Sequence, residues 1–172
     1  MSDGHVRLSD FRSARALMDA ALASAEDAES IRRQLAQMAR REGVRAQTYE
    51  PRGRSGHRAD AMAVVDARLD RERVLSERLL TDYEVIDLAT AVIYGADGHG
   101  GVMRSDGALA ADALWWRYLD GATWGKVARM VGMGVTWCQS AVATALGGID
   151  ERGMEATAGV PRGWHPDVDR EW

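Results

Sequence analysis

Apolar and alanine side chains recur at steps of mostly three and four residues along the first part of the chain. The positions in this series are Phe11, Ala14, Met18, Ala21, Ala25, Ala28, Ile31, Leu35 and Met38. This spacing places the residues on one face of a helix and is close to the coiled-coil period. Arg40 and Arg41 suit the negative end of a helix, and Gly43 is a common stop signal. The first helix is therefore expected to end near Glu42.

A second apolar series predicts another long helix. Its positions are Met62, Val65, Leu69, Leu75, Leu79, Tyr83, Ile86, Ala89 and Ile93, although Glu72 and Ser76 interrupt one turn. The connector over 43–58 is long enough to reverse the direction of the chain. We therefore expect an antiparallel helical hairpin, a coiled coil, over 11–94. Because alanine-rich faces bury little area, a second copy of the chain is expected to complete the core as a homodimer.

The connector between these helices contains the tetrapeptide Pro51-Arg52-Gly53-Arg54. It resembles the core of an AT-hook, in which arginines flank a glycine narrow enough to enter an A·T minor groove. A charged, solvated linker is the simpler interpretation, because a single incomplete core is weak evidence.

Five glycines over 95–107 predict a hinge between two helical parts. The stretch contains Asp97, His99 and Asp106, but it lacks the lysine and the preceding strand of a phosphate-binding loop. Scattered ligand types in a glycine-rich loop are also weak evidence for a metal site. The end of the chain, over 151–172, has two prolines and no apolar period, and it is expected to be a flexible tail.

Between the hinge and the tail, the stretch 108–150 predicts three short helices. Leu114, Trp115 and Tyr118 share one face of the first helix. Thr123 is placed to cap the second helix, Trp124–Val131, by accepting a hydrogen bond from a backbone N–H.

The third helix of this stretch is expected over Val135–Leu146, after a turn at Gly132-Met133-Gly134. Its candidate inner residues recur at helical spacing and are Cys138, Val142, Ala145 and Leu146. The other face of this helix is then left for a partner.

The second and third helices have the spacing of a helix-turn-helix. Counted from Trp124, Ala128 is fifth, Gly132 ninth, Met133 tenth and Cys138 fifteenth. Only a small side chain fits at Ala128 where two helices cross steeply, and the tight reversal favours glycine at Gly132. An inward apolar side chain at Cys138 would fix the third helix so that its outer face can enter a major groove. The overall prediction is an all-α fold in which a long helical hairpin is followed by a three-helix, helix-turn-helix unit.

Charge limits how such a unit could bind DNA. The net charge is −4 and the isoelectric point about 5.6, whereas compact nucleic-acid binders are usually basic. Any contact with DNA must therefore be local. The chain has no apolar run long enough for a membrane span and no hydrophobic signal region at its start. We therefore expect a cytoplasmic location and no membrane partner.

The sequence offers little support for an enzyme. His5, His57, His99 and His165 lie in expected tails and loops, where a solvated histidine is the ordinary case. Cys138 lies in an apolar series, where a small buried side chain is the ordinary case. We therefore expect no catalytic residues, no cofactor and no metal.

The segment around the predicted turn resembles a known family. The residues that carry the resemblance are the run Arg-Tyr-Leu-x-Gly-x-Thr-Trp-x-x-Val-Ala over Arg117–Ala128, the glycine turn, and the pair Ala145 and Leu146. They resemble the RinA and ArpU type of phage transcriptional regulators, strongly over 114–146 and only in pattern elsewhere within 14–149. The resemblance implies a helix-turn-helix like that of sigma-factor region four, behind an N-terminal coiled coil, that binds DNA and controls phage or prophage genes. The third helix departs from the family because Val135–Leu146 contains no lysine or arginine.

These arguments predict one DNA interface. The expected DNA-binding residues are Lys126, Arg129, Gly134, Val135, Thr136, Gln139, Ser140 and Ala143. Lys126 and Arg129 would hold phosphates, and the third-helix residues would face base edges. Double-stranded DNA is the expected partner, with host RNA polymerase as a further one.

Two alternatives remain open. A small terminase-like packaging subunit would also combine a helix-turn-helix with a coiled coil, but it would form a ring. A protein-interaction module derived from a helix-turn-helix would bind a protein and no DNA. The acidic isoelectric point and the neutral third helix favour this second alternative.

Overall fold

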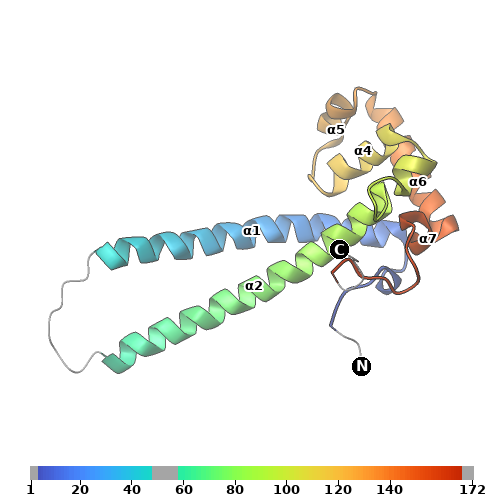
Figure 1. The fold of residues 1–172 in the computed structure, drawn as a ribbon. Coiled ribbons are helices and arrows are strands. Elements are labelled where there is room, and N and C mark those ends of the chain that lie inside the picture. The colour runs from blue at the N-terminus through green and yellow to red at the C-terminus, as the bar shows by residue number, and fades with distance from the viewer. Residues whose placement is uncertain (1–3, 48–57, 168–172) are drawn as a thin grey trace. The chain divides into compact units, whose positions relative to one another are not determined.

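The computed structural model describes residues 4–47 and 58–167, and this part of the chain is helical without strands. A short 3-10 helix, η1 (Leu8–Asp10), precedes the α-helices (Figure 1). These are α1 (Ala14–Gln47), α2 (Arg58–Tyr94), α3 (Gly101–Ser105), α4 (Ala108–Tyr118), α5 (Trp124–Val131), α6 (Val135–Arg152) and α7 (Met154–Ala158). The predicted all-α class is confirmed.

The predicted hairpin is present as the antiparallel pair α1 and α2. Helix α1 does not end near Glu42 but continues through Gly43 to Gln47. A glycine inside a helix costs only about 1 kcal/mol relative to alanine, so by itself it does not end a long helix. The AT-hook-like tetrapeptide Pro51–Arg54 lies outside the described residues.

The chain divides into two compact units, to which both long helices contribute. The arm unit is Asp27–Leu80, and the core unit comprises the described residues up to Glu26 and from Thr81 onward. The arm unit buries few apolar side chains; Ala28, Ile31 and Leu75 are among them. In contrast, the expected inward positions Met62, Val65 and Leu69 on α2 are exposed by 62%, 50% and 56%. The first part of the α2 series is therefore not covered by α1.

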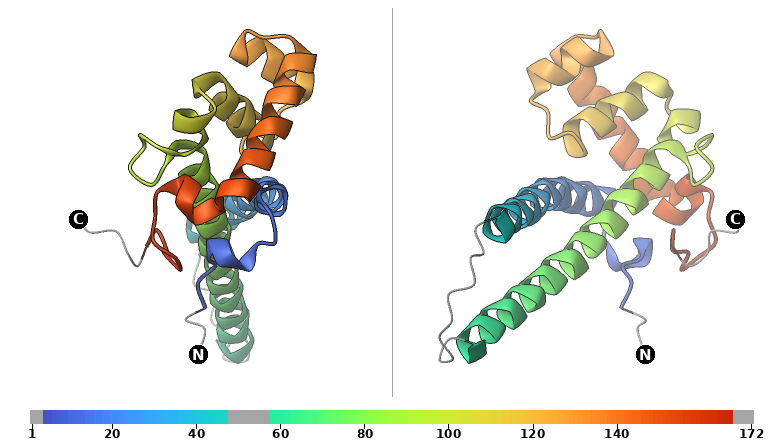
Figure 2. Two further views of the ribbon diagram at one scale, coloured as in Figure 1. Left: turned by 90° about the vertical axis from the view of Figure 1, so that its right-hand side faces the viewer. Right: turned by 60° about the vertical axis from the view of Figure 1, so that its left-hand side comes forward.

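The core unit contains the main hydrophobic core. Helices α4, α5 and α6 pack against one another in pairs, and α7 packs at the carboxyl end of α6 (Figure 2). Every helix from α1 to α7 contributes side chains to this core, α1 and α2 through the parts that lie outside the arm unit. Fully buried members include Leu17, Leu88, Val102, Leu114 and Ile149.

Polar contacts tie the three-helix unit to the first turns of α1 and the last turns of α2. The Asp150 carboxylate, on α6, accepts a hydrogen bond of 2.7 Å from the Ala14 backbone N–H at the start of α1. The hydroxyl of Tyr94, at the end of α2, donates to the Asp112 carboxylate of α4 at 2.9 Å. Burial and this carboxylate raise the pKa of Tyr94, so the hydroxyl keeps its proton and remains a donor.

The glycine-rich stretch 95–107 differs from the expected hinge, because it forms a packed corner that contains α3. Gly95 and Gly101 are buried, with φ angles of +85° and +63°. A Cβ atom on Gly101 would lie 2.6 Å from the Gly95 nitrogen and from the Ile93 carbonyl. Two backbone segments therefore cross at a distance that only glycine allows, and the crossing fixes the path from α2 into α3.

The end of the chain also differs from the expected flexible tail, as far as Asp167. Helix α7 occupies part of it, and Trp164, His165 and Pro166 are buried. The Arg7 guanidinium donates to the Gly163 carbonyl, which joins this segment to the beginning of the chain. Long-range contacts of this kind leave no local pattern in the sequence, so composition alone suggested disorder.

Candidate nucleic-acid interface

Helices α5 and α6 and the turn between them have the predicted helix-turn-helix geometry. Thr123 caps α5 by accepting from the Lys126 backbone N–H at 3.4 Å, as predicted. Gly132 ends α5 in the left-handed conformation, with φ of +75°. The Ala128 carbonyl accepts from the N–H groups of Gly132 and Met133 at 2.9 and 3.1 Å and so closes the turn. The bounds Trp124–Val131 agree with the prediction.

Helix α6 is held by one face and leaves the other open. The predicted inner residues Cys138, Val142, Ala145 and Leu146 are all buried. The predicted outer residues Val135, Thr136, Gln139, Ser140 and Ala143 are all exposed, as is Gly134 at the N-cap. The helix extends to Arg152, beyond the predicted end at Leu146, because its last turns pack against the core through Ile149.

The two predicted phosphate-binding cations differ in their surroundings. The Lys126 ammonium forms an ion pair of 2.7 Å with the Asp120 carboxylate and lies 5.4 Å from the centre of the Trp116 ring. Arg129 is exposed, and within the described part of the chain it makes neither an ion pair nor a side-chain hydrogen bond. Arg129 is therefore the more available cation of the two.

Sequence reasoning missed two exposed apolar side chains beside the turn. Met130 and Trp137 are exposed by 50% and 38%, close to the predicted outer residue Val135, which is exposed by 40%. Trp137 does not belong to the series Thr136, Gln139 and Ser140, which lies on the predicted outer face at steps of three and four. A tryptophan next to the inner residue Cys138 lies about 100° around the helix from it, and this angle indicates partial exposure.

The Cys138 side chain packs in the hydrophobic core. Its thiol is fully buried, and burial raises its pKa, so the reactive thiolate is disfavoured. This agrees with its expected place as a small inner residue.

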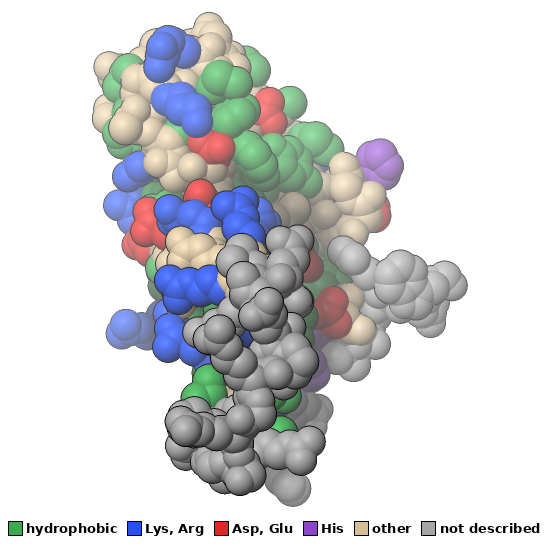
Figure 3. Space-filling model, turned by 90° about the vertical axis from the view of Figure 1, so that its left-hand side faces the viewer, with side chains coloured by type: hydrophobic (Ala, Val, Ile, Leu, Met, Phe, Trp, Pro, Cys, Tyr) green, Lys and Arg blue, Asp and Glu red, His purple; other side chains and the backbone are tan. Residues whose placement is uncertain are grey.

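In Figure 3 lysine and arginine side chains (blue) are spread over this face of the molecule. On α1, the exposed arginines include Arg33, Arg40 and Arg41. Acidic side chains lie among them, in keeping with the net charge of −4.

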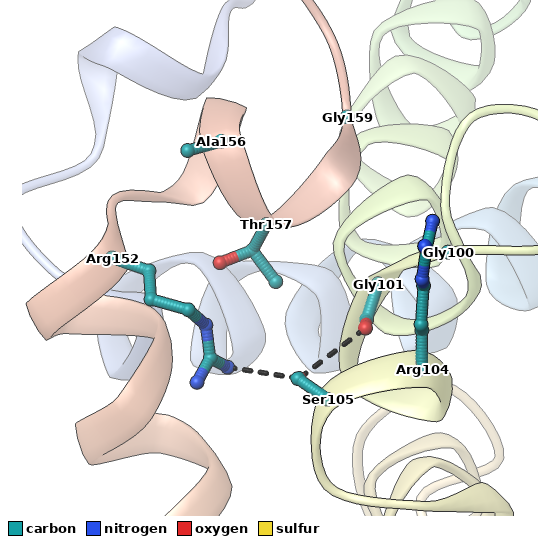
Figure 4. Close-up of a pocket in the computed structure, with 8 residues that line it drawn as sticks. All are labelled: Gly100, Gly101, Arg104, Ser105, Arg152, Ala156, Thr157 and Gly159. Atoms are coloured by element: carbon teal, nitrogen blue, oxygen red, sulfur yellow. Dashed lines mark hydrogen bonds between the residues drawn. The ribbon is translucent and has the colours of Figure 1, made fainter.

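A pocket of about 380 Å³ lies between α3 and α7 (Figure 4). Its lining includes Arg104, Ser105, Arg152 and Thr157 together with glycine backbone. The Arg152 guanidinium donates to the Ser105 hydroxyl at 3.0 Å and pairs with the Asp106 carboxylate at 3.1 Å. Asp106 offsets the charge of Arg152, so the net positive charge of the lining comes from Arg104.

Two of the histidines that were expected to be solvated belong to a polar cluster in the core unit. The His5 Nδ1 atom lies 2.8 Å from Glu84 Oε1, and the His165 Nε2 atom lies 3.7 Å from Glu84 Oε2. The His165 side chain is fully buried and that of Glu84 is 12% exposed. Burial by itself would raise the pKa of Glu84, but the hydrogen bonds from His5 and Val6 and the nearby His165 hold it below the ordinary value.

Comparison with protein families, with curated proteins and with solved structures found no match for this chain. Within the described residues, the helices are too short or too polar to cross a lipid bilayer.

Proposed function

We propose that the chain is a sequence-specific DNA-binding protein that regulates transcription of phage or prophage genes. The observation that carries the proposal is the division of α6 into a locked inner face and an open outer face, next to a capped α5 and a glycine turn. This is the arrangement that lets a second helix enter a major groove. The resemblance to RinA and ArpU type regulators supports the same function.

The outer face of α6 has the chemistry to read base edges without cations. The Gln139 amide can donate to adenine N7 and accept from adenine N6, a pairing worth about 1–3 kcal/mol of discrimination. The hydroxyls of Thr136 and Ser140 can bind either type of base, and Val135 and Ala143 can contact thymine methyl groups.

Arg129 is the side chain best placed to hold a phosphate beside this helix. Lys126 would have to exchange its ion pair with Asp120 for a phosphate, so it contributes less. With so few cations, one copy of the unit should bind with a shallow salt dependence.

Useful affinity then requires two copies on two half-sites, and we propose a homodimer. The exposed residues Met62, Val65 and Leu69 on α2 are spaced by three and four, as in a coiled-coil face. Exposed charges of both signs flank them, Asp66 and Asp70 with Arg71 and Arg73, so that an antiparallel second copy would be complementary. A terminase-like subunit would instead assemble as a ring, which mass in solution distinguishes from a dimer.

The deciding experiment is selection of bound sequences from a random DNA pool with the full chain. A defined motif is expected. Gln139→Ala should relax preference at one base position, whereas Gln37→Ala, an exposed glutamine on α1, should leave the motif unchanged. Arg129→Ala should weaken all sequences alike and reduce the salt slope by about one, and Lys126→Ala should reduce it less. Loss of the motif in the Arg129 variant with no effect at Gln139 would refute the placement of α6 in the groove.

A second candidate function is a protein-interaction module, which the exposed Met130, Val135 and Trp137 favour. Aromatic residues and methionine are enriched at protein interfaces, and α6 has no lysine or arginine over 135–146. Host RNA polymerase is the partner that a transcription regulator would contact. Failure to retain DNA even at low salt, together with loss of polymerase binding in Trp137→Ala, would favour this function over DNA reading.

A further inference from the structure

The cluster of His5, Glu84 and His165 brings together three parts of the chain that are distant in sequence. His5 precedes η1, Glu84 lies on α2, and His165 follows α7. The ligating atoms of these side chains all lie within 4.8 Å of one another. The His5 and His165 rings are 4.5 Å apart, tilted by 45°.

The spacing of these atoms fits a transition-metal ion after small movements. Zinc binds imidazole nitrogen at about 2.0–2.1 Å and carboxylate oxygen at about 2.0–2.2 Å. In tetrahedral geometry, two such ligands lie about 3.3 Å apart. His5 Nδ1 lies 2.8 Å from Glu84 Oε1 and His165 Nε2 lies 3.7 Å from Glu84 Oε2, on either side of this value. An ion bound through a single oxygen therefore requires the carboxylate to rotate.

Backbone groups around the cluster orient the ligands. The Val6 N–H donates to Glu84 Oε2 at 3.2 Å, which holds the carboxylate toward the histidines. The Asp167 N–H donates to His165 Nδ1 at 3.2 Å, so the neutral ring has its proton on Nε2. A metal at Nε2 requires the ring proton to lie on Nδ1 and the Asp167 N–H to turn away. Likewise, a metal at His5 Nδ1 requires the ring proton of His5 to lie on Nε2.

We propose that His5 Nδ1, the Glu84 carboxylate and His165 Nε2 bind one divalent ion of the zinc class. Two imidazoles with one carboxylate suit zinc and its neighbours among the transition metals better than magnesium or calcium, which prefer oxygen ligands. The buried His165 and Glu84 shield the ion, and the His5 side chain, 37% exposed, provides the route of entry. Three protein ligands leave a fourth position for water.

Such an ion would fasten both ends of the described core unit to α2. The site is independent of the proposed DNA interface, because none of its ligands lies on α5 or α6. Its expected effect is therefore on stability, since an ion that binds only the folded state raises the unfolding temperature in proportion to the logarithm of its concentration.

The test uses the full chain without a histidine tag, stripped with a chelator and titrated with Zn²⁺ by calorimetry. One equivalent should bind, and His5→Ala and Glu84→Gln should each weaken binding by at least about tenfold. The matched control is His99→Ala, which removes an exposed histidine from the corner at 95–107. It should bind Zn²⁺ like the parent chain.

Two further readouts do not depend on calorimetry. Co²⁺ in place of Zn²⁺ should give the visible absorption of a tetrahedral site in the parent chain and lose it in Glu84→Gln. Zn²⁺ should raise the unfolding temperature of the parent chain and of His99→Ala but not of His5→Ala, whose partly exposed side chain is removable without opening the core. Equal Zn²⁺ affinity in His5→Ala, Glu84→Gln and the parent chain would overturn the proposal, as would binding of less than one equivalent by the parent chain.

Discussion

The backbone crossing at Gly101 allows a stability prediction with an internal control. Gly101→Ala places a methyl group 2.6 Å from the Gly95 nitrogen and the Ile93 carbonyl, closer than the 3.0 Å that real Cβ atoms respect. The φ angle is +63°, where a side chain costs about 1–2 kcal/mol by itself. Gly98→Ala has a similar φ of +78°, but its methyl group would have no neighbour within 4 Å.

The difference between the two variants isolates the steric cost of the crossing. Both lose about 1–2 kcal/mol from the left-handed conformation. Only Gly101→Ala must also push backbone apart, and forcing extra volume into packed structure costs about 1–3 kcal/mol more. We therefore expect the free energy of unfolding to fall by about 2–5 kcal/mol in Gly101→Ala and by about 1–2 kcal/mol in Gly98→Ala.

Urea unfolding followed by tryptophan fluorescence measures this difference. All six tryptophans lie beyond residue 80, so their emission reports the core unit and not the arm unit. Gly101→Ala should shift the midpoint to clearly lower urea than Gly98→Ala does. Equal midpoints for the two variants would show that the chain does not cross itself at Gly95 and Gly101.

Three other perturbations test the packing of the core unit. Asp150→Ala should lower the free energy of unfolding by about 0.5–2 kcal/mol, because it removes the acceptor of the Ala14 N–H. Asp150→Asn keeps an acceptor and should lose less. Equal losses of the two variants in thermal melts would rule out the cap. The buried Cys138 thiol, with its raised pKa, should react with a disulfide reagent far more slowly than a free thiol and only at higher pH, and fast reaction in native buffer would contradict its burial. Ala128→Leu should lower the melting temperature through about 1–3 kcal/mol of overpacking, because Ala128 packs against the core at the turn; an unchanged melt would place the crossing elsewhere.

The sequence was most informative where short-range signals determine structure. Thr123 caps the beginning of α5, and Gly132 ends the helix in the left-handed conformation. Both effects depend on neighbours a few positions away. The inward and outward faces of α6 follow from helical spacing in the same way. These features account for the correct prediction of the bounds of α5 and of the inner and outer faces of α6.

Contacts and ion pairs between residues that are far apart in the sequence could not be predicted from such short-range signals. His165 is buried by partners that lie 81 and 160 positions away along the chain, at Glu84 and His5. The pairing of Lys126 with Asp120 depends on how the chain turns between α4 and α5. Periodicity also placed Met62, Val65 and Leu69 on one face of α2 without showing that α1 leaves them exposed.

The cap that Asp150 supplies to α1 bears on how this chain can be divided. A fragment that began after Gly107 would keep α4, α5 and α6 but lose both Ala14 and Tyr94. Asp150 and Asp112 would then lack the groups that they bind, and the core shared with α1 and α2 would open to water. Helices α4, α5 and α6 therefore do not form an independent unit. A chimaera that carries them into another protein must also take the first turns of α1 and the last turns of α2.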